Sequence, residues 1–359
     1  MKEGRSLIEL AQELERQNRM KKDYIIDTRS LIMDADTSNQ SLTLRDPSRN
    51  LQIITNVNEL AHRQIGTSLK IPATYYDRML KENPQLLADN VNSWFIKNPQ
   101  MKMIRTLDGT TRAFLSNRYR RIDNFEIAET VLPIIGEMQD ARIESCEVTD
   151  QKMYIKVVNP RLTTEVVPGD VVQAGIMITN SEVGLSSVKV QPLIYRLVCS
   201  NGMVVNDAAT RKYHIGRINE AAENFELFAD ETVKADDKAF LLKIRDTVRA
   251  AVDEVRFNKV VDMMRQSKDV KMTTTDVPKM IELAGSDFGY TKKESGGILD
   301  HLIRGGDFSL YGLANSITRY SQDVSSYDRA TDLESIGFDV MTMPSSTWKK
   351  LNEKSMEVA

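Results

Sequence analysis

The chain has 359 residues, of which 41% are hydrophobic and 28% are charged, and its formal net charge at pH 7 is -3. These values are typical of a globular protein with a sizeable core, and they exclude the globally basic class of nucleic-acid-binding proteins, so any anion-binding surface must come from local clustering. The first residues contain no uninterrupted apolar run, so the sequence predicts neither a signal peptide nor a membrane span there, and no membrane is expected among the partners.

The first section, residues 1–100, is predicted to combine a helical N-terminal part with strands. Apolar residues at helical spacing in 7–14 predict a short amphipathic helix, and residues 22–56 change to β-like runs broken by turn-forming side chains. Residues 57–97 are helical again. The stretch 61–80 has the outline of a helix-turn-helix motif, but its second helix has few groups suited to base edges, so we interpret it as two packed helices.

The second section, residues 101–217, is predicted to be mainly β, with one helix inserted at 124–138. The third section, 218–359, is predicted to be mostly helical, and the apolar spacing in 310–317 predicts a helix face that packs inward. Together the patterns predict an α+β protein with a central antiparallel sheet, a helical N-terminal section and a mostly helical C-terminal half. The three sections also fit one compact domain.

A first β-hairpin is predicted around Asp108-Gly109, a dipeptide that favours two-residue turns between strands. A loop of two residues determines which residues face each other, and here it places Arg105 opposite Arg112. Like charges in that position destabilise a strand pair by about 0.2–1 kcal/mol. The hairpin is therefore expected to need an anion, either from this chain or from another molecule.

A second hairpin is predicted around Asn201-Gly202 by the same rule. Its register places Arg196 opposite Asp207, which is a complementary pair. The contrast with the first hairpin makes the first the candidate for an anion-binding face.

Positive charge is concentrated from Met101 to Arg121, with six basic residues against one acidic residue, Asp108. Aromatic side chains beside arginines on a sheet suit single-stranded nucleic acid, because the rings stack on bases and the cations follow phosphates. The predicted nucleic-acid-binding residues are Lys102, Arg105, Arg112, Phe114, Arg118, Tyr119, Arg120 and Arg121. In the alternative interpretation, both aromatic residues belong to the core and the arginines pair with acidic residues of the chain.

The sequence predicts no cofactor, no metal site and no catalytic residue. It has no P-loop and no dinucleotide-binding motif, and its three histidines lie in separate segments. Cys146 and Cys199 have no CxxC partner, which indicates a reducing compartment and thus the cytoplasm. We expect Cys199 to be a small core residue.

Three motifs resemble a phage- and plasmid-associated family catalogued as domain of unknown function 932. They read RAFLSNRYRRIDN, NSEVGLSSVKVQPLIYRLVCSNGMV and YGLANSITRYSQDVSSYDRATDLESIG. The resemblance implies an origin in a phage, plasmid or prophage, and hence the cytoplasm of a host cell, but it implies no particular activity. The predicted order of a β-hairpin, a helix and further antiparallel strands is also similar to the core of phage single-strand annealing proteins, which form rings or filaments around a basic groove.

Three functions are consistent with these patterns. The first is a homo-oligomeric protein that binds or anneals single-stranded DNA during recombination or replication of a mobile element, without being an enzyme. The second is a metal-dependent nuclease with Glu182 or Asp170 in its site. The third is an interaction protein that binds a host factor through its acidic helices and does not bind nucleic acid.

Overall fold

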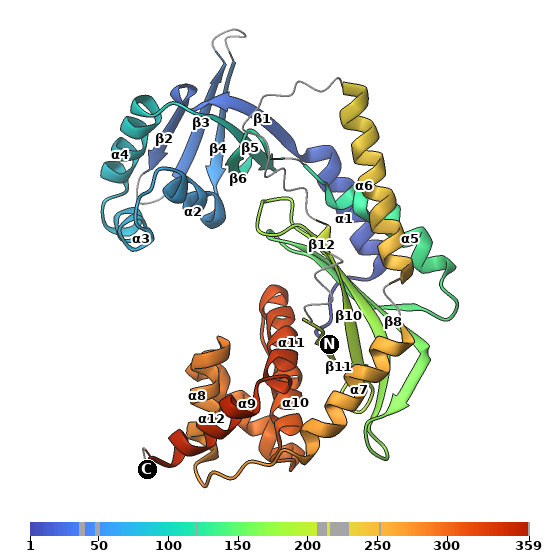
Figure 1. Cartoon of the computed structure of the whole chain (residues 1–359). Coiled ribbons are helices and arrows are strands. Elements are labelled where there is room, and N and C mark those ends of the chain that lie inside the picture. The colour runs from blue at the N-terminus through green and yellow to red at the C-terminus, as the bar shows by residue number, and fades with distance from the viewer. Residues whose placement is uncertain are drawn as a thin grey trace. The chain divides into compact units, whose positions relative to one another are not determined.

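The computed structural model confirms the α+β class and the mostly helical C-terminal part (Figure 1). It describes residues 1–35, 40–46, 51–119, 121–206, 214–215, 230–250 and 253–357. The chain forms two compact units that are each built from separate segments. Unit 1 contains Met1–Leu10, Glu126–Asn180 and Ser187–Ala359, and unit 2 contains Ala11–Phe125 and Ser181–Ser186.

Unit 2 is built on a six-stranded sheet with the order β1-β5-β6-β4-β3-β2. Its neighbouring strands are antiparallel except β4 and β6, which run parallel over a short stretch. The strands are β1 (Lys22–Asp27), β2 (Leu31–Ala35), β3 (Gln40–Asp46), β4 (Leu51–Val57), β5 (Met101–Leu107) and β6 (Thr110–Ser116), with a 3-10 turn, η1 (Thr28–Ser30), between the first two.

Helices α2 (Glu59–Ser68), α3 (Ala73–Glu82) and α4 (Pro84–Lys97) lie against one face of this sheet (Figure 1). Helix α4 begins where Asn83 accepts a hydrogen bond from a backbone amide of the first turn, and its first residue is a proline, whose missing N–H has no cost there. Alternation along the strands and the helical period along α4 place apolar side chains in one buried cluster.

Unit 1 contains a second sheet, with the order β11-β10-β9-β8-β7 and β12 paired to β10. The strands predicted as one central sheet are therefore divided between two, because β5 and β6 pair with β1 and β4 of unit 2. The strands of unit 1 are β7 (Arg142–Val148), β8 (Met153–Glu165), β9 (Val171–Asn180), β10 (Val188–Arg196), β11 (Asn201–Val204) and β12 (His214–Ile215).

Helices α1 (Leu7–Met20) and α5 (Asn124–Glu137) each contain residues of both units. The three predicted sections follow one another along the sequence and were defined by its residue patterns, whereas the two units are defined by which residues pack together. The remaining helices of unit 1 are α6 (Asp230–Ala250), α7 (Glu254–Asp269), α8 (Val277–Phe288), α9 (Lys292–Gly305), α10 (Leu310–Tyr320), α11 (Tyr327–Met341) and α12 (Ser345–Glu357).

The predicted inward face of α10 is confirmed, since Leu310, Leu313, Ala314 and Ile317 are all buried. Helices α8, α9, α11 and α12 pack around α10, and α7 packs on strands β9 and β10. None of the described helices is long and apolar enough to cross a membrane.

A partly buried ion pair joins the start of α9 to α11. The side chain of Glu294 accepts hydrogen bonds from Arg329 Nε at 2.7 Å and Nη2 at 2.8 Å, and it closes a capping box with Thr291. The Arg329 guanidinium lowers the pKa of Glu294 to about 2 from an ordinary 4.5. The carboxylate thus stabilises the fold fully above pH 4.5, and this contribution disappears as the pH falls toward 2.

Replacing Glu294 with Gln is expected to lower the free energy of unfolding at pH 7 by about 1–3 kcal/mol, because the bidentate charged pair is lost. It is also expected to flatten the pH dependence of stability between the ordinary and the lowered pKa. Denaturant unfolding across a pH series measures both effects. Glu282→Gln is the control, since Glu282 lies in a more exposed pair with Lys292 and should change stability by under about 1 kcal/mol. Equal effects of the two variants would contradict the assignment.

Candidate functional site

The β5–β6 hairpin turns at Asp108 and Gly109 as predicted, and both residues have positive φ, at 50° and 75°. The predicted opposition of Arg105 and Arg112 is wrong. A register shift follows Arg105, which is paired with Ala113 instead. Arg112 is the extra residue on β6, and such a β-bulge moves every later pair by one position.

Arg105 is completely buried within unit 2, where three acceptors surround its guanidinium. Nε donates to Asp23 at 2.8 Å, Nη2 donates to Asp123 at 2.7 Å, and Nη1 donates to the carbonyl oxygen of Glu182 at 2.8 Å. Burial alone would lower the pKa of Arg105, but the two carboxylates raise it above its ordinary value. The charge is therefore held permanently inside the unit, and its guanidinium has no exposed surface to offer a phosphate.

Arg112 is also buried, and its counterion is the side chain of Glu182. Arg112 Nη2 donates to Glu182 Oε2 at 2.5 Å, and the other carboxylate oxygen accepts from the backbone amide of Asn124 at 2.6 Å. Asn124 begins α5, where the helix dipole favours negative charge. The anion that the hairpin requires is thus supplied by the chain, and Glu182 contacts both arginines.

Phe114 lies in the core of unit 2 and not on an exposed face. It is 4% exposed and stacks on Phe95, with ring centroids 5.9 Å apart. Lys102 is half-buried, with its ammonium 5.5 Å from the Phe114 ring. A nucleic-acid base therefore has no access to the Phe114 ring.

The loop after β6 contains the exposed members of the predicted set. Arg118 and Arg121 are exposed, and Arg120 lies outside the described residues. Tyr119 between them is half-buried, and its hydroxyl donates to the carbonyl oxygen of Ser181 at 3.1 Å. Of the residues predicted to contact nucleic acid, these two arginines are the ones that the structure describes as exposed.

The second hairpin differs from its prediction too. Strand β10 ends at Arg196, which is paired with Asn201, and residues 197–200 form a four-residue turn with Ser200 at a φ of 50°. The prediction of a two-residue turn at Asn201-Gly202 is thus wrong, and Asp207, the predicted partner of Arg196, lies outside the described residues. Arg196 instead donates to Asp170 from Nε at 2.5 Å and from Nη2 at 2.9 Å.

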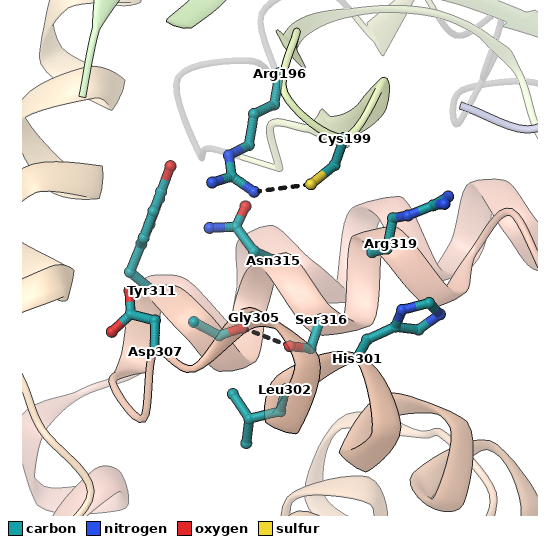
Figure 2. A pocket seen from close by; sticks show the side chains of 11 residues that line it. Arg196, Cys199, His301, Leu302, Gly305, Asp307, Tyr311, Asn315, Ser316 and Arg319 are labelled. Carbon is teal, nitrogen blue, oxygen red and sulfur yellow. Dashed lines mark hydrogen bonds between the residues drawn. The ribbon is translucent and has the colours of Figure 1, made fainter. Parts of the chain in front are cut away.

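This turn forms one wall of a cavity of ≈ 90 Å³ in unit 1, and helices α9 and α10 form the rest (Figure 2). Polar and charged groups from several elements meet there. They include Arg196, Cys199, His301, Asp307, Asn315 and Arg319.

Cys199 is half-buried in the cavity wall, so the prediction that it is a core residue is wrong. Its sulfur accepts a hydrogen bond from Arg196 Nη1 at 3.4 Å (Figure 2). Gln322 fixes the backbone of the turn by donating from Nε2 to the carbonyl oxygens of Cys199 at 3.1 Å and Ser200 at 3.2 Å. No short motif in the sequence signals this cavity, because its members come from distant segments.

The two carboxylates considered for a nuclease site neutralise arginines of the chain. Glu182 is paired with Arg112 and Asp170 with Arg196. Within the described ranges, no group of three or more His, Cys, Asp or Glu side chains is arranged to hold a metal ion.

The fold and these sites define an α+β protein with a neutralised arginine cluster in one unit and a polar cavity in the other. A family model described as domain of unknown function (DUF932) matches residues 113–336, which is more than half of the chain. The chain therefore belongs to the DUF932 family. No curated protein and no solved structure matches it.

Replacing Arg105 with Met is expected to lower the free energy of unfolding by about 3–5 kcal/mol, because Asp23 and Asp123 would lose the buried cation that they share and keep only the more peripheral Arg121 and Lys21 as partners. Denaturant unfolding and hydrogen exchange of β5 and β6 measure the loss. Arg118→Met is the control, since Arg118 is exposed, and it should change stability by less than about 0.5 kcal/mol. A small effect at Arg105 would contradict its structural role.

Proposed function

We propose that the protein binds single-stranded DNA in a recombination or replication step of a phage or another mobile element. The observation that supports this most is the exposed position of Arg118 and Arg121 in the loop after β6, where Arg121 keeps 56% of its side chain accessible. Arginines on a fixed loop can follow a phosphate backbone without reading sequence.

The loop is anchored at both sides of these arginines. The amide of Tyr119 donates to the carbonyl oxygen of Ser116 at 2.9 Å, and the hydroxyl of Tyr119 is bound to Ser181. Further along, Asp123 accepts from Arg105 and from Lys21, the latter at 2.5 Å. An anchored loop loses less conformational entropy when it binds a strand, which favours affinity.

The buried arginines therefore have a different part in this proposal from the one that the sequence predicted. Arg105 and Arg112 hold the hairpin and the loop in place, while Arg118 and Arg121 contact phosphates. One nitrogen of Arg121 donates to Asp23 at 3.0 Å, and 56% of the Arg121 side chain stays accessible, so a phosphate can approach the guanidinium from solvent.

Two further parts of the proposal have other support. The association with phages and plasmids is supported by the resemblance in sequence motifs, and with it we propose that the protein acts in the cytoplasm of a host cell. Homo-oligomerisation is supported by the general requirement that cooperative coverage of a strand needs contacts between protomers. No specific feature of the described residues favours the nuclease or the host-factor alternative.

The double variant Arg118→Gln, Arg121→Gln is expected to bind a labelled single-stranded oligonucleotide more weakly. The slope of log affinity against log salt should become shallower by about 1.4, since each lost contact with a single strand contributes about 0.7. Fluorescence anisotropy across a sodium chloride series, with single- and double-stranded oligonucleotides, measures both quantities.

The matched control is Arg29→Gln, Arg78→Gln, which removes the same charge from exposed positions elsewhere in unit 2. It should leave the slope nearly unchanged. Absent or salt-independent binding by the native protein would overturn the proposed function. Equal slopes for the two double variants would show that this loop is not the contact.

A further inference from the structure

Two exposed apolar side chains lie on the face of the unit 2 sheet that is turned away from its core. Ile25 of β1 and Met101 of β5 are 59% and 43% exposed. Tyr24 and Ile26 pack on the core cluster of this unit, and Ile104 belongs to it. Because successive side chains of a strand alternate between the two faces, Ile25 and Met101 both lie on the opposite face.

The strand register places these two side chains beside each other and beside Arg121. Ile25 is paired with Met103, which follows Met101 by two residues on the same face, so Ile25 and Met101 are diagonal neighbours on adjacent strands. Arg121 reaches this face as well, since its Nη1 donates at 3.0 Å to Asp23, two residues before Ile25 on β1. We call Ile25 and Met101 the apolar patch, and it adjoins the arginines of the loop after β6.

The ion pairs around the apolar patch carry an excess of positive charge. Three carboxylates share four basic partners. The carboxylates are those of Asp23, Asp123 and Glu182, and the partners are Arg105, Arg112, Arg121 and Lys21. Asp27, which is paired with Met101 in the register, is bound by Arg29 and adds no net charge. Among these described side chains one positive charge is therefore in excess, before the exposed Arg118 is counted.

An apolar patch beside exposed arginines matches the chemistry of a single DNA strand. The arginines can follow the phosphates, while the flat faces of unpaired bases lose contact with water when they pack on apolar side chains. In a duplex these faces are stacked inside the helix, and the grooves offer only the edges of the bases. The patch would therefore add affinity for a single strand and none for a duplex.

We propose that Ile25 and Met101 form a platform for the bases of the strand whose phosphates contact Arg118 and Arg121, and that this platform selects single-stranded over double-stranded DNA. The inference rests on the proposed function and adds to it the contact that recognises unpaired bases. The excess of positive charge favours a polyanion over a second copy of the chain, because two copies that met at this patch would bring like charges together.

Oxidation of Met101 by hydrogen peroxide reports whether bases cover the patch. Met356 in unit 1 is 44% exposed, close to the 43% of Met101, and serves as the internal reference. The rate of sulfoxide formation at each residue of the native protein is followed by peptide mass spectrometry. A thymidine oligonucleotide at ten times its Kd is expected to slow the oxidation of Met101 about tenfold and that of Met356 not at all. An abasic strand of equal length, at ten times its own Kd, should leave both rates unchanged.

The variant Ile25→Ser separates the contact with bases from the contact with phosphates. It is expected to bind the thymidine oligonucleotide about fivefold to tenfold more weakly, because apolar area is no longer buried against a base. Its affinity for the abasic strand and its salt dependence should match those of the native protein. Ile54→Ser is the control, since Ile54 of β4 is 65% exposed and lies on the same face of the sheet, so its affinity for both strands should be native. If Ile25→Ser does not fold, the oxidation of Met101 in the native protein decides the question.

Equal affinity of the native protein for the thymidine and the abasic strand would overturn the inference, as would unchanged oxidation of Met101 in the DNA complex. Protection of Met101 that rises with protein concentration in the absence of DNA would assign the patch to a contact between copies of the chain, and would overturn it too. If neither strand binds, the proposed function fails together with the inference. If both strands bind equally and with the expected salt dependence, the inference alone fails.

Discussion

The carboxylate of Glu182 is the interaction on which the arrangement of unit 2 depends. It neutralises Arg112 and accepts a hydrogen bond from the backbone amide of Asn124 at the start of α5. The backbone carbonyl oxygen of Glu182 also accepts a hydrogen bond from Arg105. A buried charge is tolerated only if it is paired and hydrogen-bonded, since its desolvation costs several kcal/mol. Two buried arginines therefore require that Ser181–Ser186 return to this unit, although the chain on both sides of that segment belongs to unit 1.

This constraint also separates the arginines by function. The guanidinium of Arg105 is surrounded by acceptors from three distant parts of the sequence, so it stabilises the hairpin and the loop that follows. Arg118 and Arg121 belong to the same basic stretch but stay exposed, and they remain able to exchange partners. A basic cluster in a sequence can thus contain buried arginines that stabilise the fold and exposed arginines that belong to the surface, and their burial distinguishes the two kinds.

The sequence alone predicts those features of the fold that depend on residues close together in the chain. The α+β class, the first hairpin turn and the inward face of α10 follow from periodicity and from the φ preferences of Asp-Gly. The division into two sheets, the register shift after Arg105 and the four-residue turn before Asn201 could not be predicted, because each depends on tertiary pairing. A bulge shifts the pairing of two strands by one residue, and for this reason Arg105 is paired with Ala113 and not with the predicted Arg112. The cavity was missed for a related reason, since Gln322 and Cys199 meet only in the folded chain.

The partner of each arginine provides a physical criterion for its role in both units. Arg105, Arg112 and Arg196 have carboxylates as partners, so their charge is compensated before any other molecule approaches. Arg319 has an amide as its described partner, which orients the guanidinium but does not cancel its charge. Coulomb attraction at short range is several times stronger in a partly buried site than in bulk water. An anion that approaches Arg105 would have to displace a carboxylate that is already desolvated and aligned.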